Sequence, residues 1–455
     1  MPREKVGKVK NAQSPEPSLA ITYHNIEELR ADPQNPRTHS RRQIQKLAHS
    51  IECVGFNCPV LIDCKLNIVA GHGRLQAAKL AGIRRVPTIC LDHLNEAQIR
   101  AFMIADNRLA ELAAWDEHLL IGQLKVLEVE LKCDLEVTGF EMGEIDMMLE
   151  GASSTSNAEP DPADELSELR SGVRVTGTGD VWSLGRHRLI CGDALDEQAY
   201  RALMENQSAD AVFTDPPYND PINGFVTRSP KTHDAKFAMA SSEMGRPEYV
   251  EFLRQSLSLL ARHSHSGALN FIGMDWRHAR ELLTAAEGVF SEFHNLCVWV
   301  KQEGGQGSLY ASQHELVFVF KTGKDKHRNN VQLGQHGRYR TNVWQYPRVN
   351  SLGKTNAEKD FISLHPTAKP VRLVADAILD CSARGDIILD PFLGSGTTLI
   401  AAERVGRVCY GIELAPAFVD LMIRRWQALS GLPALHCKSG QSFREREGVA
   451  GEEQA

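Results

Sequence analysis

The sequence predicts an α/β protein whose larger part is a mixed, mostly parallel sheet, preceded by a small α/β domain and a helical segment. Three observations predict this fold. Strand-like and helix-like segments alternate over residues 173–436, as a mostly parallel sheet requires. A strand, a glycine turn, a helix and a second strand follow one another over residues 386–413. Two short apolar strands precede a helical run over residues 59–81.

With 455 residues the chain is long enough for two or three domains. The ends and the linker are polar and rich in Pro, Ser, Asp and Glu, whereas leucines at helical spacing predict helices before the linker. The predicted segments are a disordered stretch over 1–18, an α/β domain over 19–110, a helical segment over 111–150, a linker over 151–172, the larger domain over 173–436 and a polar, frayed tail over 437–455.

Composition excludes several classes of protein. No apolar run is long enough to cross a bilayer and the N-terminus lacks the apolar stretch of a signal peptide, so we expect a cytoplasmic protein with no membrane partner. The ten cysteines form no CxxC pair and no Cys/His cluster at zinc spacing, which predicts reduced thiols and no metal site. A net charge of −7 excludes a uniformly basic coat but leaves a local DNA-binding surface open.

The glycine turn lies between two strands and is followed by a carboxylate at the end of the second strand. In such units the glycines let a ligand approach the backbone, and the acid binds ribose hydroxyls. A phosphate-binding Rossmann loop fits less well because the GxGxxG spacing is missing, and a plain tight turn is the structural alternative. The candidate cofactor residues here are Asp390, Phe392, Gly394, Ser395, Gly396 and Glu413.

The segment His365–Pro370 stands just before a predicted helix over 371–379. A loop with a helix-starting proline would explain it. The Thr367 hydroxyl and the Lys369 ammonium are also suited to hold the carboxylate at the methionine end of S-adenosylmethionine (SAM).

A second motif, Asp215-Pro216-Pro217-Tyr218, follows a predicted strand over 209–214. An aromatic amine is a poor nucleophile, and two acceptors on its N–H groups, the Asp215 carboxylate and the Pro216 carbonyl, push electron density back onto nitrogen. The prolines hold the chain extended, and Tyr218 offers a face on which an extruded base can stack. A proline-stiffened turn explains the prolines but not the flanking acid and aromatic residue.

Residues 180–430 resemble the amino-methylating DNA methyltransferases (N6-adenine or N4-cytosine) of the beta arrangement. The segments that carry the resemblance are Cys191–Leu195, Asp215–Tyr218, Val298–Lys301, Gln313–Glu315, Thr341–Trp344, His365–Pro370, Asp390–Gly396 and Tyr410–Glu413. The resemblance implies SAM as cofactor, Asp193 on its adenine and Glu413 on its ribose, and direct in-line transfer to a flipped base of double-stranded DNA. An Asp at the head of the catalytic motif favours adenine N6, with cytosine N4 as the alternative. A partition or regulatory protein with an inactive methyltransferase fold is the alternative of another class.

Basic residues between the two motifs indicate target recognition within residues 219–360, although a solvated face is the default for a charge run. The candidate DNA contacts are Arg228, Lys231, Arg328, Arg338 and Arg340. A homodimer stays open.

Residues 19–110 resemble the ParB/sulfiredoxin-type N-terminal domain through Asn35–Arg37, the strand pair and the loop Gly71-His72-Gly73-Arg74. Gly71, Gly73 and Arg74 at a helix start are suited to a phosphate of a nucleotide or of DNA. ParB-type CTP binders carry Glu-Arg-Arg where this loop has His72-Gly73-Arg74, and the sulfiredoxin Cys is absent, which argues against CTP hydrolysis, nuclease action and sulfinic-acid repair. A purely structural domain is the other interpretation.

The whole layout resembles ParB-domain-bearing methyltransferases of prophages and mobile elements, and the lack of an endonuclease motif favours a solitary methyltransferase.

Overall fold

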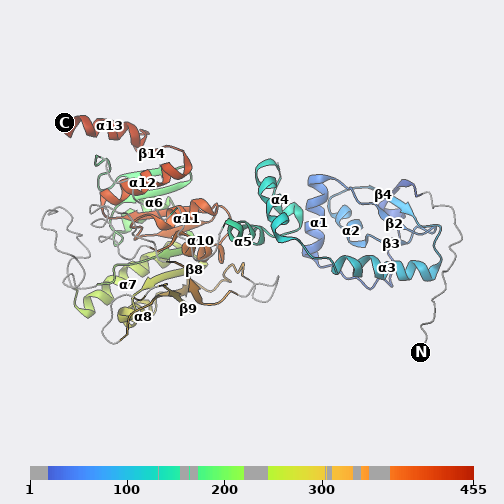
Figure 1. Cartoon of the computed structure of the whole chain (residues 1–455), viewed down its shortest axis with the longest axis horizontal. Coiled ribbons are helices and arrows are strands. Elements are labelled where there is room, and N and C mark those ends of the chain that lie inside the picture. The colour runs from blue at the N-terminus through green and yellow to red at the C-terminus, as the bar shows by residue number, and fades with distance from the viewer. Residues whose placement is uncertain are drawn as a thin grey trace, which may run out of the picture. The chain divides into compact units, whose positions relative to one another are not determined.

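The computed structural model describes residues 19–131, 133–153, 163, 173–219, 244–302, 304, 310–331, 340–347 and 369–454. The chain divides into two compact units, Met1–Ile145 and Asp146–Ala455, and Figure 1 labels many of their helices and several of their strands. The stretch predicted to be disordered and most of the predicted linker lie outside the described residues.

The first unit holds a four-stranded sheet in the order β1 (Ile21–Asn25), β4 (Arg85–Cys90), β2 (Val60–Ile62), β3 (Ile68–Ala70). Strands β2 and β3 pair antiparallel, which confirms the predicted strand pair. Helix α2 (His72–Leu80) begins three residues before the predicted helical run because Gly71, with a φ of 102°, forms its left-handed N-cap. Helices α1 (Arg41–Val54) and α3 (Glu96–Glu111) complete this part.

The segment predicted to be helical contains α4 (Glu117–Glu130) and the start of α5 (Met142–Ser153). The side chain of Asp116 accepts a hydrogen bond from the amide of Leu119, so an N-cap begins α4. Leu124 is buried while Leu119 is 69% exposed. The leucines at this spacing therefore form a helix without all facing one core.

A disulfide joins Cys53, near the end of α1, to Cys133, which follows α4. The expectation of reduced thiols is wrong for this pair. Eighty residues separate the two cysteines along the chain, and the fold brings their Cα atoms within 6.7 Å. Such a tertiary pairing leaves no signal in cysteine spacing. The thiols of Cys191 and Cys409, in contrast, are free and buried.

The second unit contains a ten-stranded sheet, counted over the described residues, in the order β11-β9-β10-β8-β7-β12-β13-β6-β5-β14. The five central strands, β8 to β6, are parallel, and antiparallel neighbours flank them on both sides. The predicted mixed sheet is therefore confirmed. The strands are β5 (Val181–Leu184), β6 (His187–Cys191), β7 (Ala209–Thr214), β8 (Ser264–Met274), β9 (Glu292–Val300), β10 (His314–Lys321), β11 (Val343–Gln345), β12 (Ile387–Asp390), β13 (Val408–Glu413) and β14 (Ala434–His436).

Helices cover both faces of this sheet. One apolar cluster packs the strands against α10 (Val371–Leu379), α11 (Thr397–Arg404) and α12 (Pro416–Ser430). A second cluster packs the opposite face against α6 (Glu197–Met204), α7 (Arg246–Arg262) and α8 (Ala279–Ala286). The result is a three-layer α/β/α arrangement, in which loops at the carboxyl ends of the strands are free to bind ligands.

The expectation of a frayed tail is wrong. Residues Phe443–Gln454 form helix α13, and the Phe443 side chain is only 1% exposed. Arg424 of α12 makes an ion pair with Glu447 at 2.7 Å. Arg446 of α13 makes a second ion pair, with Asp180 at 3.3 Å. One buried aromatic side chain and two ion pairs therefore attach a segment that is polar on average.

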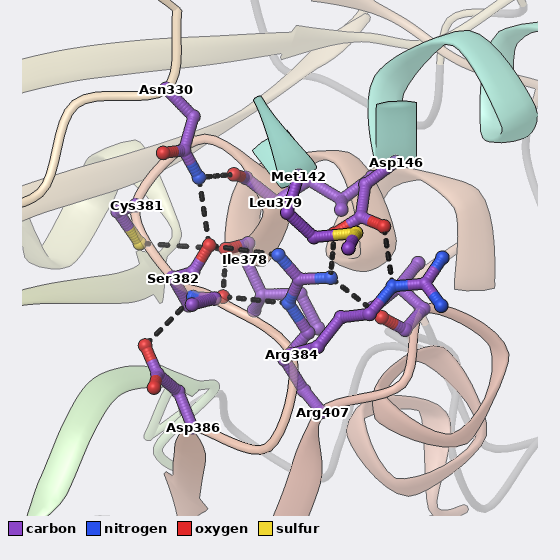
Figure 2. Close-up of polar contacts among 12 residues, drawn as sticks. Met142, Asp146, Asn330, Ile378, Leu379, Cys381, Ser382, Arg384, Asp386 and Arg407 are labelled. Carbon is purple, nitrogen blue, oxygen red and sulfur yellow. Dashed lines mark hydrogen bonds and ion pairs between the residues drawn. The ribbon is translucent and has the colours of Figure 1, made fainter. Parts of the chain in front are cut away.

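A buried polar cluster fixes Asp146 of α5 to the segments that precede β12 and β13 (Figure 2). The guanidinium of Arg407, which is fully buried, donates to Asp146 of α5 and to the Ser382 carbonyl, the latter at 2.8 Å. Arg384 donates to the other oxygen of Asp146 at 2.6 Å. A buried arginine requires such partners, so Asp146 is part of the core of the second unit.

Candidate active site

The Asp-Pro-Pro-Tyr tetrapeptide follows directly after β7, at the carboxyl end of one of the five parallel strands. The hydroxyl of Tyr249 donates to the Pro217 carbonyl at 2.7 Å. Asn219 exchanges two hydrogen bonds with the backbone of Met244, at 2.9 and 3.0 Å. These contacts fix both the tetrapeptide and the chain that leaves it, so Asp215 is presented from a rigid support.

The Asp215 carboxylate contacts two side chains. The ammonium of Lys369 lies 2.8 Å from its Oδ2 atom, and the hydroxyl of Tyr218 donates to its Oδ1 atom at 3.4 Å. Lys369 also donates to the Tyr218 hydroxyl at 3.0 Å and lies 5.6 Å from the centre of the Tyr218 ring. The Asp215 side chain remains 22% exposed, whereas that of Lys369 is only 1% exposed.

This position of Lys369 differs from the predicted one. The sequence placed its ammonium on the carboxylate of SAM, but the structure places it behind Asp215. The residue precedes α10, whose N-terminus lies at the carboxyl edge of the sheet. The lysine therefore reaches the catalytic motif, 154 residues away along the chain. Its neighbour Thr367 lies outside the described residues.

Sequence reasoning assigned no role to Glu315, which begins the buried part of β10. Its Oε2 atom lies 2.9 Å from the ammonium of Lys369, and its Oε1 atom pairs with Lys301 at the end of β9. The Glu315 side chain is 8% exposed. Lys301 and Glu315 both lie in segments that carry the family resemblance, and this was the sequence signal that could have marked them as candidate site residues.

Burial and charge oppose each other across this cluster. Burial raises the pKa of Asp215 above its ordinary value, and the Lys369 ammonium works against that rise. Burial alone would lower the pKa of Lys369, but the carboxylates of Asp215 and Glu315 outweigh it, and the pKa is raised well above its usual range. Burial would also raise the pKa of Glu315, but Lys369 and Lys301 hold it below the ordinary value. Lys369 is therefore an ammonium and Glu315 a carboxylate at neutral pH.

Gly273 of β8 provides the space that the Asp215 carboxylate occupies. Strand β8 is parallel to β7, and Ile272 pairs with Thr214, so Gly273 is the next residue along from that pair. A Cβ atom at this position would lie 1.7 Å from Oδ1 of Asp215. A glycine inside a strand is a known signal for close approach, and it went unused in the sequence-based prediction.

Asp390, predicted to bind the cofactor, instead joins the two motifs. Its Oδ1 atom accepts a hydrogen bond from the hydroxyl of Thr214, and its Oδ2 atom accepts one from Thr398 of α11, both at 2.7 Å. The amide of Phe392 also donates to Oδ1, at 3.1 Å. Asp390 is 4% exposed, and burial raises its pKa to about 7.

Glu413 ends β13 beside the glycine turn. Its two carboxylate oxygens accept from the amides of Gly394 and Ala415, at 2.9 and 2.8 Å. Burial raises the pKa of Glu413 to about 7, against the effect of these two amides. Asp193 follows the adjacent strand β6, and its Oδ1 atom accepts from the amide of Leu195 at 2.8 Å. Two carboxylates thus stand side by side at the carboxyl edge of the sheet.

The remaining residues of the turn have structural contacts. The φ angles of Gly394 and Gly396, 55° and 81°, lie in the left-handed region. A Cβ at Gly396 would also lie 2.7 Å from Met422 of α12. The carbonyl of Ser395 accepts from Arg425 at 3.0 Å. The glycine turn is therefore tightly packed against α12.

The predicted DNA contacts fall into two groups. Arg228, Lys231 and Arg338 lie outside the described residues. Arg340 instead pairs with Asp380, just after α10, at 2.6 Å, and Arg328 lies 3.8 Å from Asp386, just before β12. Both acids are at the edge of the sheet opposite Asp215, because α10 runs away from Lys369 and β12 runs back. These contacts give Arg328 and Arg340 acidic partners at that edge, and DNA binding by the two arginines stays a prediction.

In the first unit, Arg74 donates to the Cys58 carbonyl at 3.1 Å, and His72 accepts from the amide of Asp32 at 3.3 Å. Burial lowers the pKa of His72, so its imidazole is neutral at pH 7. A Cβ at Gly73 would lie 3.0 Å from the ring of His39. The loop is closely packed, and phosphate binding by Gly71, Gly73 and Arg74 stays a prediction.

Over the described residues, three or more His, Cys, Asp or Glu side chains nowhere gather in a way that suits a metal ion. Helices in this part of the chain are too short or too polar to span a bilayer.

Residues 209–424 match the N6/N4 methyltransferase family, described as DNA methylase, and residues 10–107 match the ParB N-terminal domain family. The chain is 26% identical over 254 residues to the type II methyltransferase M.HpaI of Haemophilus parainfluenzae, covering 52% of this chain and 73% of that protein. It is 28% identical over 285 residues to the DNA adenine methyltransferase YhdJ of Escherichia coli K12, covering 58% and 88%. It is 44% identical over 80 residues to the ParB-like nuclease domain-containing protein YnaK of the same organism, covering 18% and 92%.

Proposed function

Since the chain belongs to the N6/N4 DNA methylase family and carries a ParB N-terminal domain, we propose that it is a SAM-dependent, site-specific DNA methyltransferase acting on the N6 amino group of adenine. The base is turned out of the duplex and receives the methyl group directly. The observation that carries the proposal is the buried Asp390 bridge, which joins the strand before Asp215 to the helix after the glycine turn. An amine-binding motif and a nucleoside-binding turn therefore share one edge of the sheet.

The residues at this edge fit SAM. Each oxygen of Glu413 accepts one backbone amide and keeps a second lone pair for a ribose hydroxyl. Asp193 follows the neighbouring strand β6 and is suited to the amino group of the cofactor's adenine. When bound, SAM supplies a methyl group already activated by its sulfonium centre, so no protein nucleophile is needed.

The chain's own residues then orient the amine. Asp215 accepts an N–H of the exocyclic amino group through its exposed side, and Tyr218 offers its ring to the base. Hydrogen bonding of that N–H to Asp215 favours a lone pair localised on nitrogen. That lone pair would form the new N–C bond as the methyl carbon leaves the sulfonium sulfur, and the surplus N–H proton would then pass to the Asp215 carboxylate. Because alignment is the main requirement, the rigid support of Asp215 is a large part of the catalysis.

Adenine is favoured over cytosine by the Asp at the head of the catalytic motif. The similarity to an adenine methyltransferase over 88% of its length supports the same choice. Cytosine N4 is the alternative substrate within the family.

The test combines cofactor binding with product analysis. Calorimetry measures SAM binding, and unmethylated DNA is incubated with labelled SAM, hydrolysed to nucleosides and analysed by mass spectrometry. We expect N6-methyladenine, and we expect Asp215→Ala to abolish transfer while SAM affinity is retained. Glu287→Ala, at an exposed position after α8, is the matched control and should behave as wild type. N4-methylcytosine would select the alternative base, and absence of SAM binding would select a regulatory protein with an inactive fold.

A further inference from the structure

We infer that Glu315 and Lys369 are positioning residues of the methyl-transfer site, which act through Asp215 by setting its charge without touching the base. The inference rests on the proposed function and adds two roles to it. Its basis is the chain of contacts from Asp215 to Lys369 to Glu315 to Lys301.

The exposed fractions of the side chains show which member of this series of contacts a substrate can reach. Asp215 is 22% exposed, whereas Lys369 and Glu315 are 1% and 8% exposed. A base that enters the site can therefore reach Asp215, while the two residues behind it are covered. Any effect of Lys369 and Glu315 on the reaction must pass through the carboxylate that they hold.

Four separate elements bring these residues together. Asp215 follows β7, Glu315 lies at the start of β10, Lys301 follows β9 and Lys369 precedes α10. Strands β9 and β10 are antiparallel, so the end of one and the start of the other meet at the edge where β7 ends. The fold thus places two carboxylates against two ammonium groups. A buried cluster of balanced charge is stable only when each member is paired, which gives each residue a fixed place.

Asp215 is faced by groups of both signs. Lys369 lowers its pKa, as does the hydroxyl of Tyr218 from its own loop, whereas Glu315 and burial raise it. Asp390 of β12 is also close to Asp215, whose negative charge contributes to the raised pKa of Asp390. An ionised carboxylate is the better acceptor for an amino N–H. Lys369 therefore keeps Asp215 in its working form, and Glu315 holds Lys369 while partly offsetting its charge.

Opposite effects on the pH profile follow for two variants. In Lys369→Met the cation is lost, and the acid limb of the rate profile moves up by about one to three pH units. In Glu315→Gln the second anion is lost while Lys369 stays, so the acid limb moves down. Lys369→Arg keeps the charge and should give a profile closer to wild type than Lys369→Met does. A purely structural role would lower the rate at every pH and leave the limb in place.

The experiment measures single-turnover transfer of labelled methyl groups to unmethylated DNA between pH 5 and 9, with the full-length chain. Calorimetry of SAM binding to each variant verifies that the site is folded. Acid limbs that shift in opposite directions support the inference. Unshifted limbs, or limbs that shift in the same direction, overturn it while wild-type transfer leaves the proposed function standing. A wild-type chain that binds SAM and transfers no methyl group overturns both.

Discussion

A single methyl group at Gly273 is the smallest change that reaches the proposed catalytic carboxylate. The residue lies on β8 beside β7, and an added Cβ would lie 1.7 Å from Oδ1 of Asp215 and 2.9 Å from its Cγ. Both distances are shorter than any real contact of a Cβ atom. Gly273→Ala therefore forces the carboxylate away while every charge in the site is kept.

The size of the effect follows from the overlap. Carbon and oxygen atoms that are not bonded rest about 3.5 Å apart, so Oδ1 must move by roughly 1.8 Å. Displacement of a catalytic group by about 1 Å costs on the order of 100-fold in rate. We expect the methyl-transfer rate of Gly273→Ala to fall by at least about 100-fold, and stability to fall by about 1–3 kcal/mol from overpacking.

The assay is single-turnover methyl transfer to unmethylated DNA, with SAM affinity measured in parallel by calorimetry. Affinity should stay within about threefold of wild type, because Glu413 is on β13, and β7 and β12 stand between that strand and β8. Gly122→Ala on α4 is the matched control, since a Cβ there meets no atom within 4 Å.

Two results would refute the reasoning. One is a Gly273→Ala enzyme that transfers methyl groups within about threefold of the wild-type rate, because the overlap would then be relieved without moving Asp215. The other is a loss of SAM affinity as large as the loss of rate, because the substitution would then disturb the whole edge of the sheet.

Two further predictions concern other parts of the second unit. Burial raises the pKa of Glu413 to about 7, and this carboxylate must be ionised to accept hydrogen bonds from ribose hydroxyls, so SAM should bind about tenfold more weakly at pH 6 than at pH 8. Calorimetry of SAM binding at the two pH values measures the difference. An equal pH dependence of SAM binding in Glu413→Gln would contradict the prediction. Asp146→Ala leaves the fully buried Arg407 without its carboxylate and should cost about 3–5 kcal/mol in urea unfolding, whereas Arg201→Ala, which breaks an exposed pair, should cost under about 0.5 kcal/mol.

The raised pKa values also fix the sign of a stability effect. Asp390 and Glu413 have ordinary pKa values of 3.8 and 4.5, and burial raises both to about 7. The native state therefore holds these protons more tightly than the unfolded state. Their contribution to stability is fully present below about pH 4 and is lost as the pH rises through 7.

Elements with strong local signals were predicted correctly from the sequence. Strand β7 and helix α10 have the predicted bounds, and β12, α11 and β13 follow one another within the predicted unit over residues 386–413. Buried parallel strands are continuous apolar runs, and a glycine turn between two of them is itself local information. The mixed character of the sheet follows from the same segments.

Pairings between distant residues could not be predicted in this way. Lys369 was predicted from its neighbours to bind the cofactor, because nothing in the local sequence shows that Asp215 and Glu315 lie beside it. Arg340 lies in a basic stretch of the sequence, and its acidic partner Asp380 stands far along the chain, after α10. In each case the sequence shows the charged residue but not which distant residue pairs with it. Gly273 is different, because a glycine inside a strand is a signal that sequence analysis can use.

The Asp390 bridge explains how two motifs so far apart in sequence can form one site. Thr214 and Thr398 donate to the two oxygens of one buried carboxylate, and strands β7 and β12 pair directly. None of these contacts depends on how the chain travels between the motifs. The segment between them carries β8 to β11, while Asp215 keeps its place beside the glycine turn. Under the proposed function, specificity for a DNA sequence can therefore change in loops of that segment, provided that Gly273, Glu315 and Lys369 keep their places around Asp215.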